Sequence, residues 1–330
     1  MFRLFRNNTF HAVSNRILTT QKLCIVVKRL YFTYCMLLKK NISILYFLKL
    51  IKWDVLAILL YASLVGALDH LLFFKDITIP LGLSALIGTL LSLLLAFRTS
   101  QSYERWWEAR VIWGAIVNDS RTFIRQLLHF LPDDDRKAGY IKEFALRQSV
   151  WCYTLADSLR KLPLSGKVAA YFTQHAYESD NRPNFLLTKH VEHLAELGRH
   201  YQLNVNVQVQ LDSSIVRLTD HMGKCERIKN TVFPRSYSVL IHFLIYVLMT
   251  VLPFGLDDNH PFVEAILATL VPVLFIAIER TAILMQDPFE NRPTDTPMST
   301  LSATIESNLM EMANTAANPQ PPEAGDYYVM

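Results

Sequence analysis

The chain has 330 residues, of which 51% are hydrophobic and 19% are charged. Soluble domains carry about 25% charged residues, so this composition is apolar for its length. The formal net charge of +4 is too small to indicate a nucleic-acid-binding protein. The cysteines lie far apart without a Cys-x-x-Cys pair, which argues against a disulfide scaffold or a thiolate zinc site. They are Cys24, Cys35, Cys152 and Cys225.

The start of the chain is strongly basic. Residues 1–53 hold ten Lys and Arg and no acidic residue, which predicts a cytoplasmic arm on the membrane surface over residues 1–50. An organelle transit peptide is an alternative, because such peptides are also basic and poor in acids. Another alternative is that translation starts at Met36 and that the preceding residues are not part of the protein. Serine is scarce and apolar runs interrupt the segment, which favours the arm.

Two apolar windows are long enough to cross a bilayer. Residues 77–97 contain twenty-one positions without a charge, which as a helix would extend about 31 Å. Residues 237–256 add twenty uncharged positions, in which His242 is the group that titrates near neutral pH. We predict that both are membrane helices.

Two further windows are less regular. Residues 261–278 carry one charge, Glu264, near one end. Residues 55–74 reach spanning length only if Asp69 and His70 lie at the water interface. With these two the sequence predicts four membrane helices. A buried helix of a soluble core is the alternative for 55–74.

The distribution of Lys and Arg predicts the orientation, because loops rich in these residues stay on the cytoplasmic side. Residues 98–236 hold twenty basic and fifteen acidic residues. The connecting segments 69–80 and 257–260 hold a single basic residue, Lys75. We therefore expect both termini and the long middle segment on the cytoplasmic side of the cell membrane.

The middle segment is helical in pattern. The expected fold class is all-α: a multi-pass membrane protein with four transmembrane helices and a large cytoplasmic helical domain. Helical spacing recurs over 103–130, 140–161, 166–178, 186–200 and 203–229, and again over 299–313 before a polar tail. The predicted domains are the arm 1–50, membrane helices 51–101, the cytoplasmic helical domain 102–236, membrane helices 237–281 and the C-terminal segment 282–330.

The window 77–97 carries two stripes at a spacing of four residues. Small residues form the first, which would let membrane helices pack closely: Ser84, Gly88, Ser92 and Ala96. The second lies about 100° around the helix and consists of Thr89, Leu93 and Phe97. This second stripe fits either a pore lining or ordinary contact with lipid or a neighbour, and spacing alone favours the contact.

Polar clusters in the middle segment give weaker signals. His190, His193 and His200 with Glu192 resemble metal ligands, but they lack the His-Glu-x-x-His order, so we expect a solvated helix face. The acidic run 133–135 is expected in a surface turn rather than a divalent-ion site. We find no Gly-rich phosphate loop and no Gly-x-Ser-x-Gly motif. The sequence therefore predicts no enzyme, no cofactor and no metal.

Residues next to the membrane windows have their own expected roles. Trp106 and Trp107 follow Arg105 and are typical of interface aromatics. Pro272 lies within the fourth window and should kink it. Glu279 and Arg280 are expected to close that helix at the cytoplasmic surface.

Three segments resemble the bestrophin family. LLLAFRTSQSYERWWEARVIWG at 93–114 resembles its signature of a helix end running into Arg-Trp-Trp. KCERIKNTVFPRSYSVLIHFLIYVLMTVLPFGL at 224–256 is similar to the third membrane helix of bacterial homologues. QDPFENRPTDTPMSTLSATIESNLMEM at 286–312 is similar to their stretch after the fourth. The resemblance covers roughly residues 40–315 and leaves residues 1–35 outside.

The resemblance implies a pentameric ion channel in the bilayer, with small inorganic ions as the permeating species. In that family the second membrane helix lines a hydrophobic neck whose last ring lies eight residues before the Arg of Arg-Trp-Trp. Here the three rings would be Thr89, Leu93 and Phe97, which reverses the preference from spacing alone. Thr89 departs from the usual apolar ring. A lower aperture is expected around 203–209, with Val205 as its residue.

Animal bestrophins hold calcium with a run of acids after the fourth helix. Here that stretch offers only Asp287, Glu290 and Asp295, too few for the six to eight oxygens that calcium needs. We therefore expect no calcium dependence.

The function predicted is passive anion (chloride) conduction through a homopentamer. The surplus of five basic residues in 98–236 favours anions, whereas Asp69, Asp76, Asp257 and Asp258 outweigh Lys75 in the outer loops. A cation channel of the same fold, a transporter and a membrane-anchored signalling protein are the alternatives. A transporter should show repeated halves and broken helices, and the sequence has no such repeat.

Overall fold

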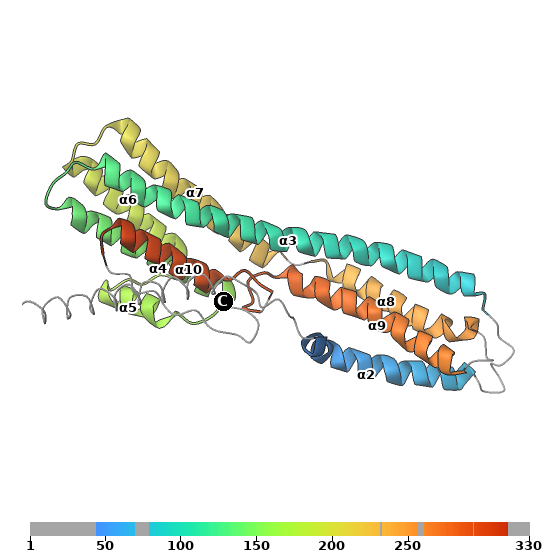
Figure 1. Ribbon diagram of the computed structural model, residues 1–330. Helices are drawn as coiled ribbons and strands as arrows, with labels where there is room; N and C mark the ends of the chain where they lie inside the picture. The colour runs from blue at the N-terminus through green and yellow to red at the C-terminus, as the bar shows by residue number, and fades with distance from the viewer. Residues whose placement is uncertain (1–43, 70–78, 232, 257–260, 293, 316–330) are drawn as a thin grey trace, which may run out of the picture.

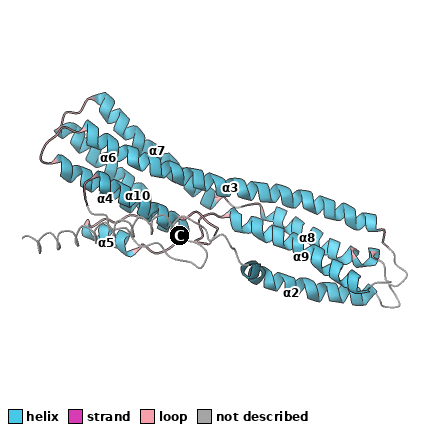
Figure 2. Ribbon diagram, viewed as in Figure 1, coloured by secondary structure: helices cyan, strands magenta, loops and turns pink. Residues whose placement is uncertain are grey.

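The structure is a computed structural model that describes residues 44–69, 79–231, 233–256, 261–292 and 294–315. All regular structure in these residues is helical (Figure 2). The helices are α2 (Ile44–Asp69), α3 (Leu81–Phe130), α4 (Lys137–Arg160), α5 (Gly166–Gln174), α6 (Arg182–His200), α7 (Val205–Asn230), α8 (Arg235–Val251), the short η1 (Pro253–Gly255), α9 (Pro261–Gln286) and α10 (Met298–Met312).

The helices form an elongated molecule with two units, joined by α3 (Figure 1). The apolar unit consists of α2, α8, α9 and the first half of α3. The distal unit consists of α4, α5, α6, α7, α10 and the second half of α3. Since α3 has 50 residues, it extends about 75 Å at 1.5 Å per residue.

The continuity of α3 corrects the sequence analysis, which placed one helix at 77–97 and another at 103–130. The polar residues between them, Arg98 to Ser102, include neither Gly nor Pro, and the helix passes through them without a break. At the other end, α3 begins only after Pro80, its N-cap residue. Proline has no backbone N–H and is tolerated just at a helix start. Residues 77 and 78 lie outside the described residues.

The other apolar windows also differ in their bounds. Helix α2 begins at Ile44, so the end of the predicted arm is already helical; residues 70–74 of the window lie outside the described residues. Helix α9 runs on to Gln286, past the predicted end at 278. In the distal unit, α6 starts at Arg182, where the side chain of Asn181 accepts a hydrogen bond from the backbone N–H of Asn184 and caps the helix.

Within the described residues, three helices are long and apolar enough to cross a membrane: those containing Ile51–Leu68, Leu81–Phe130 and Phe262–Gln286. Helix α8 has 17 residues and counts as a fourth span only when it is joined to α7 across a 40° bend. Many leucines of the apolar unit face outward, as expected of a surface in contact with lipid: Leu56, Leu59, Leu60, Leu64, Leu83, Leu86 and Leu90 are all exposed.

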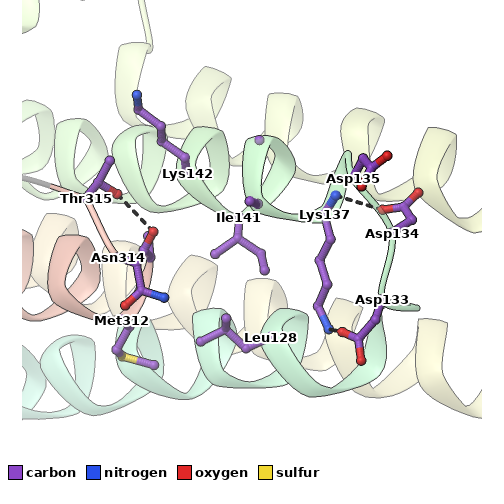
Figure 3. Close-up of a pocket in the computed structure, with 13 residues that line it drawn as sticks. Leu128, Asp133, Asp134, Asp135, Lys137, Ile141, Lys142, Met312, Asn314 and Thr315 are labelled. Carbon is purple, nitrogen blue, oxygen red and sulfur yellow. Dashed lines mark hydrogen bonds and ion pairs between the residues drawn. The ribbon is translucent and has the colours of Figure 1, made fainter.

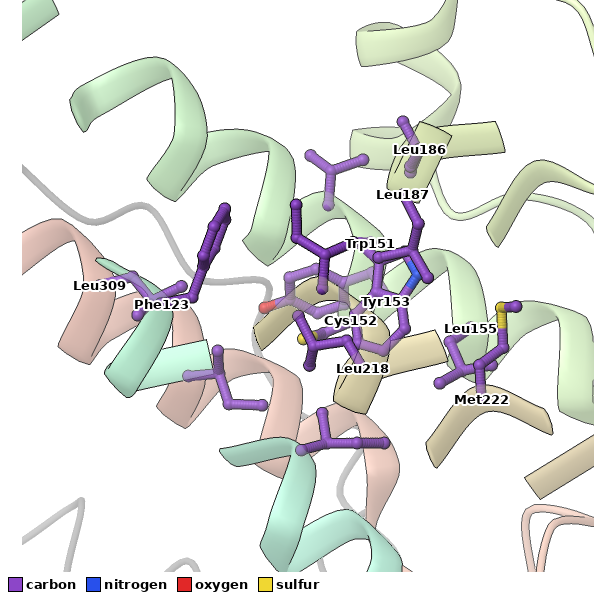
Figure 4. Close-up of a cluster of buried hydrophobic side chains, with 14 of the residues drawn as sticks. Phe123, Trp151, Cys152, Tyr153, Leu155, Leu186, Leu187, Leu218, Met222 and Leu309 are labelled. Atoms are coloured by element: carbon purple, nitrogen blue, oxygen red, sulfur yellow. The ribbon is translucent and has the colours of Figure 1, made fainter. Parts of the chain in front are cut away.

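The distal unit has its own hydrophobic core. Large aromatic side chains from α3 and α4 fill its centre, and aliphatic side chains from α6, α7 and α10 close around them (Figure 4). Trp113, Phe123, Phe144 and Trp151 are each fully buried. Burial raises the pKa of the Cys152 thiol to about 12, so this cysteine acts as a small apolar side chain.

His190 lies inside this core, and the expectation of a solvated histidine face is wrong for it. Its ring stacks on Phe144, with centroids 5.4 Å apart, and meets the edge of Phe123. Only His200, at the end of α6, is exposed. Leu186, Leu194 and Leu197 share the buried face, so the apolar period of α6 carries His190 inward. Desolvation holds the pKa of His190 well below 6.5.

This burial predicts an acid-labile core. The unfolded chain binds a proton at His190 near pH 6.5, whereas the folded chain does not, so stability is lost as pH falls below 6.5. The loss is about 1.4 kcal/mol at pH 5.5 if the folded histidine stays neutral. Replacing His190 by Leu should flatten the decline. Unfolding followed by tryptophan fluorescence at pH 7.5 and 5.5 measures it, with His200→Leu as the matched control. An equal decline in the His190→Leu variant would contradict this.

Candidate functional site

The first half of α3 presents two different faces. One packs against α8 and α9 through Leu91, Leu95, Arg98 and Ser102, all buried. The predicted neck residues lie elsewhere on the helix. Leu93 is 68% exposed and Phe97 is 56% exposed, and Thr89 is exposed as well. The structure therefore brings the three together on one line of α3 that the other described residues leave uncovered.

Local contacts fix the orientation of this line. The ring of Phe97 lies 6.1 Å from the ring of Tyr237 on α8, centroid to centroid. The hydroxyl of Tyr237 donates to the carbonyl of Leu94 at 2.9 Å, which ties α8 to α3 one turn away. The hydroxyl of Thr89 donates to the carbonyl of Ala85 at 2.8 Å. Because that hydroxyl is already bonded within the helix, Thr89 adds less polarity to the line than its side chain suggests.

The small stripe is mostly uncovered too. Ser84 is buried, but Ser92 and Ala96 are exposed. A Cβ added to Gly88 would meet no described atom within 4 Å. Ser92 and Ala96 instead border a hollow of about 510 Å³ on the flank of α3, which α9 completes with Phe275. Packing of this stripe against another helix stays a prediction, with the hollow as the place for it.

A buried ion pair lies one residue beyond the predicted neck residues. Arg98 donates from Nη1 to Oε1 of Glu279 at 2.7 Å, and the two side chains are 2% and 1% exposed. His242 approaches the other carboxylate oxygen at 3.3 Å. The guanidinium of Arg98 also lies over the ring of Phe233, 5.2 Å from its centroid. The expectation that Glu279 closes α9 at the surface is therefore wrong, because Arg98 holds it inside the helix bundle.

A second ion pair lies next to the first. The guanidinium of Arg280 donates to both carboxylate oxygens of Asp54 on α2, at 2.7 and 2.8 Å. Both side chains are partly exposed. The two pairs join α3 to α9 and α9 to α2, so all three helices are linked at one level.

Arg105 joins the two units. It donates to the carbonyls of Ile228 and Thr231 at 2.7 and 2.8 Å, and to that of Gln286 at 3.0 Å. These carbonyls lie at the C-terminal ends of α7 and α9, where backbone acceptors have no partner within the helix. One side chain of α3 thus caps two helices. Its neighbour Trp106 donates from its indole nitrogen to the carbonyl of Thr294 at 2.6 Å.

The residue predicted for the lower aperture lies at the start of α7, at the end of the distal unit that points away from the apolar unit (Figure 1). Val205 is the first residue of α7 and is 71% exposed. The side chain of Asn204 accepts from the backbone N–H of Asn206 at 2.8 Å and caps the helix there. Val209, one turn on, is also exposed. The aperture stays a prediction, since one chain does not enclose it.

The three acids after α9 are occupied by the protein itself. Asp287 pairs with Lys229 at 2.6 Å, and Glu290 pairs with Arg292. Asp295 accepts from two backbone N–H groups of its own loop, and desolvation raises its pKa to about 6. Within the described residues no group of His, Cys, Asp and Glu is arranged to hold a metal ion.

The acidic run 133–135 forms the surface turn expected of it (Figure 3). Asp133 pairs with Lys137 at 2.5 Å. Asp134 accepts from the backbone N–H of Lys137 and from the hydroxyl of Tyr201, a contact that lowers its pKa. A hollow of about 820 Å³ separates this turn from the end of α10.

One known protein family matches most of this chain. Residues 26–311 match the family described as Bacterial/Fungal Bestrophin protein. The chain belongs to the bacterial and fungal bestrophin family. The resemblance in the three motifs is thereby confirmed, and the matched region also takes in residues 26–35, which the motifs left outside.

Individual relatives of this chain are named as anion channel-forming proteins or as bestrophin homologues. A voltage-dependent anion channel-forming protein of Ralstonia nicotianae is 31% identical over 256 residues, which cover 76% of this chain and 83% of that protein. The voltage-dependent anion channel-forming protein YneE of Escherichia coli is 28% identical, over 71% of this chain and 77% of that one. The crystal structure of a bacterial bestrophin homologue from Klebsiella pneumoniae shares the fold, with a TM-score of 0.72, 23% identity, and coverage of 81% and 99%.

The sequence analysis of this bestrophin missed the ion pair and the cap made by Arg105. Arg98 is the first charge after the window 77–97, and Glu279 is the first after 261–278. Two opposite charges at the ends of two apolar windows are a usable signal, because a buried charge needs a partner. Arg105 gave no such signal, because its partners are backbone carbonyls.

The buried ion pair predicts strongly non-additive stability changes. Removing one partner, by Arg98→Met or Glu279→Gln, should cost about 3–5 kcal/mol, because the other charge stays buried without its ion-pair partner. The double variant should cost less than the sum of the two. Unfolding of the detergent-solubilised protein in a double-mutant cycle measures this. The exposed pair is the control: Asp54→Asn should cost about 1 kcal/mol or less. Additive effects at Arg98 and Glu279 would show that they do not interact.

Proposed function

We propose that this bestrophin is a passive anion channel and that Thr89, Leu93 and Phe97 line its neck. The observation that carries the proposal is the uncovered line on α3. Leu93 and Phe97 are large apolar side chains that the other described residues of their chain do not bury. The names of the relatives in Ralstonia nicotianae and Escherichia coli, both anion channel-forming proteins, support conduction of anions.

A homopentamer would enclose the neck line, which a single chain leaves open on one side. The described residues of one chain do not enclose the neck line, so a pore requires a ring of subunits that each contribute one α3. The exposed small residues Ser92 and Ala96, and the apolar hollow beside them, are suited to close approach by a neighbouring subunit. In this arrangement α8 is the third of four membrane helices in chain order, and both termini lie with the distal unit on the cytoplasmic side of the cell membrane.

The neck would control conduction by excluding water from its apolar constriction. Three rings of side chains at a four-residue spacing give an apolar constriction about two turns long, and such constrictions gate by expelling water rather than by a charged filter. Arg98 directly follows Phe97, but it lies about 100° around the helix and turns into the bundle toward Glu279. Its charge is therefore kept out of the constriction.

The proposed position of Leu93 and Phe97 in the neck predicts how shortening these side chains changes conduction. The double variant Leu93→Ala, Phe97→Ala widens and wets the narrowest point, so single-channel conductance or open probability should rise about twofold or more. Purified protein in planar bilayers gives both quantities. The matched control is Leu60→Ala together with Leu64→Ala, which trims exposed apolar side chains of α2. Native mass spectrometry checks that each variant keeps the mass of five 38.0 kDa subunits. Unchanged currents from the α3 variant would place its side chains outside the pore.

Selectivity is decided by reversal potentials. The surplus of five basic residues in 98–236 should concentrate anions on the cytoplasmic side, although exposed charges more than about 8 Å from the path are screened. Under a gradient of potassium chloride across a planar bilayer, the reversal potential should shift toward the chloride equilibrium potential. A shift toward the potassium equilibrium potential would instead identify a cation channel of the same fold. The outer acids of the sequence analysis, Asp69, Asp76, Asp257 and Asp258, lie where no side chain is described.

A further inference from the structure

The uncovered face of α3 continues past the neck. Seven residues turn a helix through about 700°, nearly two full turns, so positions seven apart share a face. Counting on from Phe97 gives Glu104, Val111 and Asn118, and all four are exposed. Glu104 is the one charged residue of this set, and it lies about 10 Å along the axis from Phe97.

The carboxylate of Glu104 has neutral partners. The hydroxyl of Ser100 approaches one of its oxygens at 3.5 Å, and the amide of Gln101 donates to the other at 3.3 Å. Among the described residues Glu104 makes no ion pair. Its negative charge is thus held on the uncovered face without an ion-pair partner among the described residues.

The charged residues nearest to Glu104 in the sequence have other partners. Arg105 caps α7 and α9 with its guanidinium. Glu108 pairs with Arg227 of α7 at 2.6 Å. The guanidinium of Arg110 lies over the ring of Trp106, 5.2 Å from its centroid. Glu104 therefore differs from these neighbours in leaving its full charge on the face that follows the neck.

We propose that Glu104 forms a ring of carboxylates immediately inside the neck and weakens the anion preference of the channel. The inference rests on the proposed function, because the ring exists only if the neck line faces a common axis. Five carboxylates near the ion path repel anions and attract cations over a distance comparable with the Debye length, about 8 Å at physiological salt. Because water on this side of the neck is not expelled, the ring acts on hydrated ions through the local concentration.

The test compares Glu104→Gln with the wild type in planar bilayers under a potassium chloride gradient. The chloride-to-potassium permeability ratio should rise about threefold or more, and Glu104→Lys should raise it further. Glu192→Gln is the matched control, because it removes the same charge from an exposed position on α6 and should leave the ratio unchanged. Lowering the salt concentration should enlarge the effect of Glu104→Gln, since screening weakens.

Each result separates the inference from the proposed function. Wild-type current with an unchanged ratio in both Glu104 variants overturns the inference and leaves the channel in place. A Glu104→Gln variant that loses the pentameric mass in native mass spectrometry places Glu104 in a subunit contact, and this also overturns the inference. Failure of the wild type to conduct overturns the proposed function itself, and the ring with it.

Discussion

Arg105 is the contact on which the arrangement of the two units depends. Its guanidinium reaches three carbonyls at the ends of α7 and α9, so helices distant in the sequence end against the same side chain of α3. The last carbonyls of a helix have no partner within the helix, and here one cation donates to those of two helices. Lysine could not replace this residue equally, because an ammonium group lacks the planar fork that spans several acceptors.

The sequence predicted the apolar helices well because bilayer thickness demands long uncharged windows, and α3 and α9 contain them. Their ends were predicted poorly, for reasons that lie elsewhere in the chain. The charge on Arg98 suggested a helix end, yet Arg98 pairs with Glu279, 181 positions away, and lies buried within a continuous helix. His190 was assigned to solvent because a histidine reads as polar, whereas its burial follows from the aromatic side chains of α3 and α4 that surround it.

The candidate site was found by combining two kinds of signal. Periodicity grouped Thr89, Leu93 and Phe97 on one face, but it could not separate a pore lining from a lipid contact. The family motif at Arg105 supplied the register. Neither signal addressed the charges around the neck, which the structure sorts by direction: Arg98 points into the bundle, whereas Glu104 stays outside it. Such sorting depends on side-chain partners and cannot be read from spacing.

The unbroken length of α3 has a mechanical consequence. A helix of 50 residues held at Arg105, close to its midpoint, behaves as a stiff lever with two arms of about 37 Å each. A tilt of about 5° around that pivot would carry each tip through roughly 3 Å, comparable with the radius of a hydrated ion. Strain applied to the far tip of the distal unit would therefore pass along α3 to the proposed neck, without any intervening loop to absorb it.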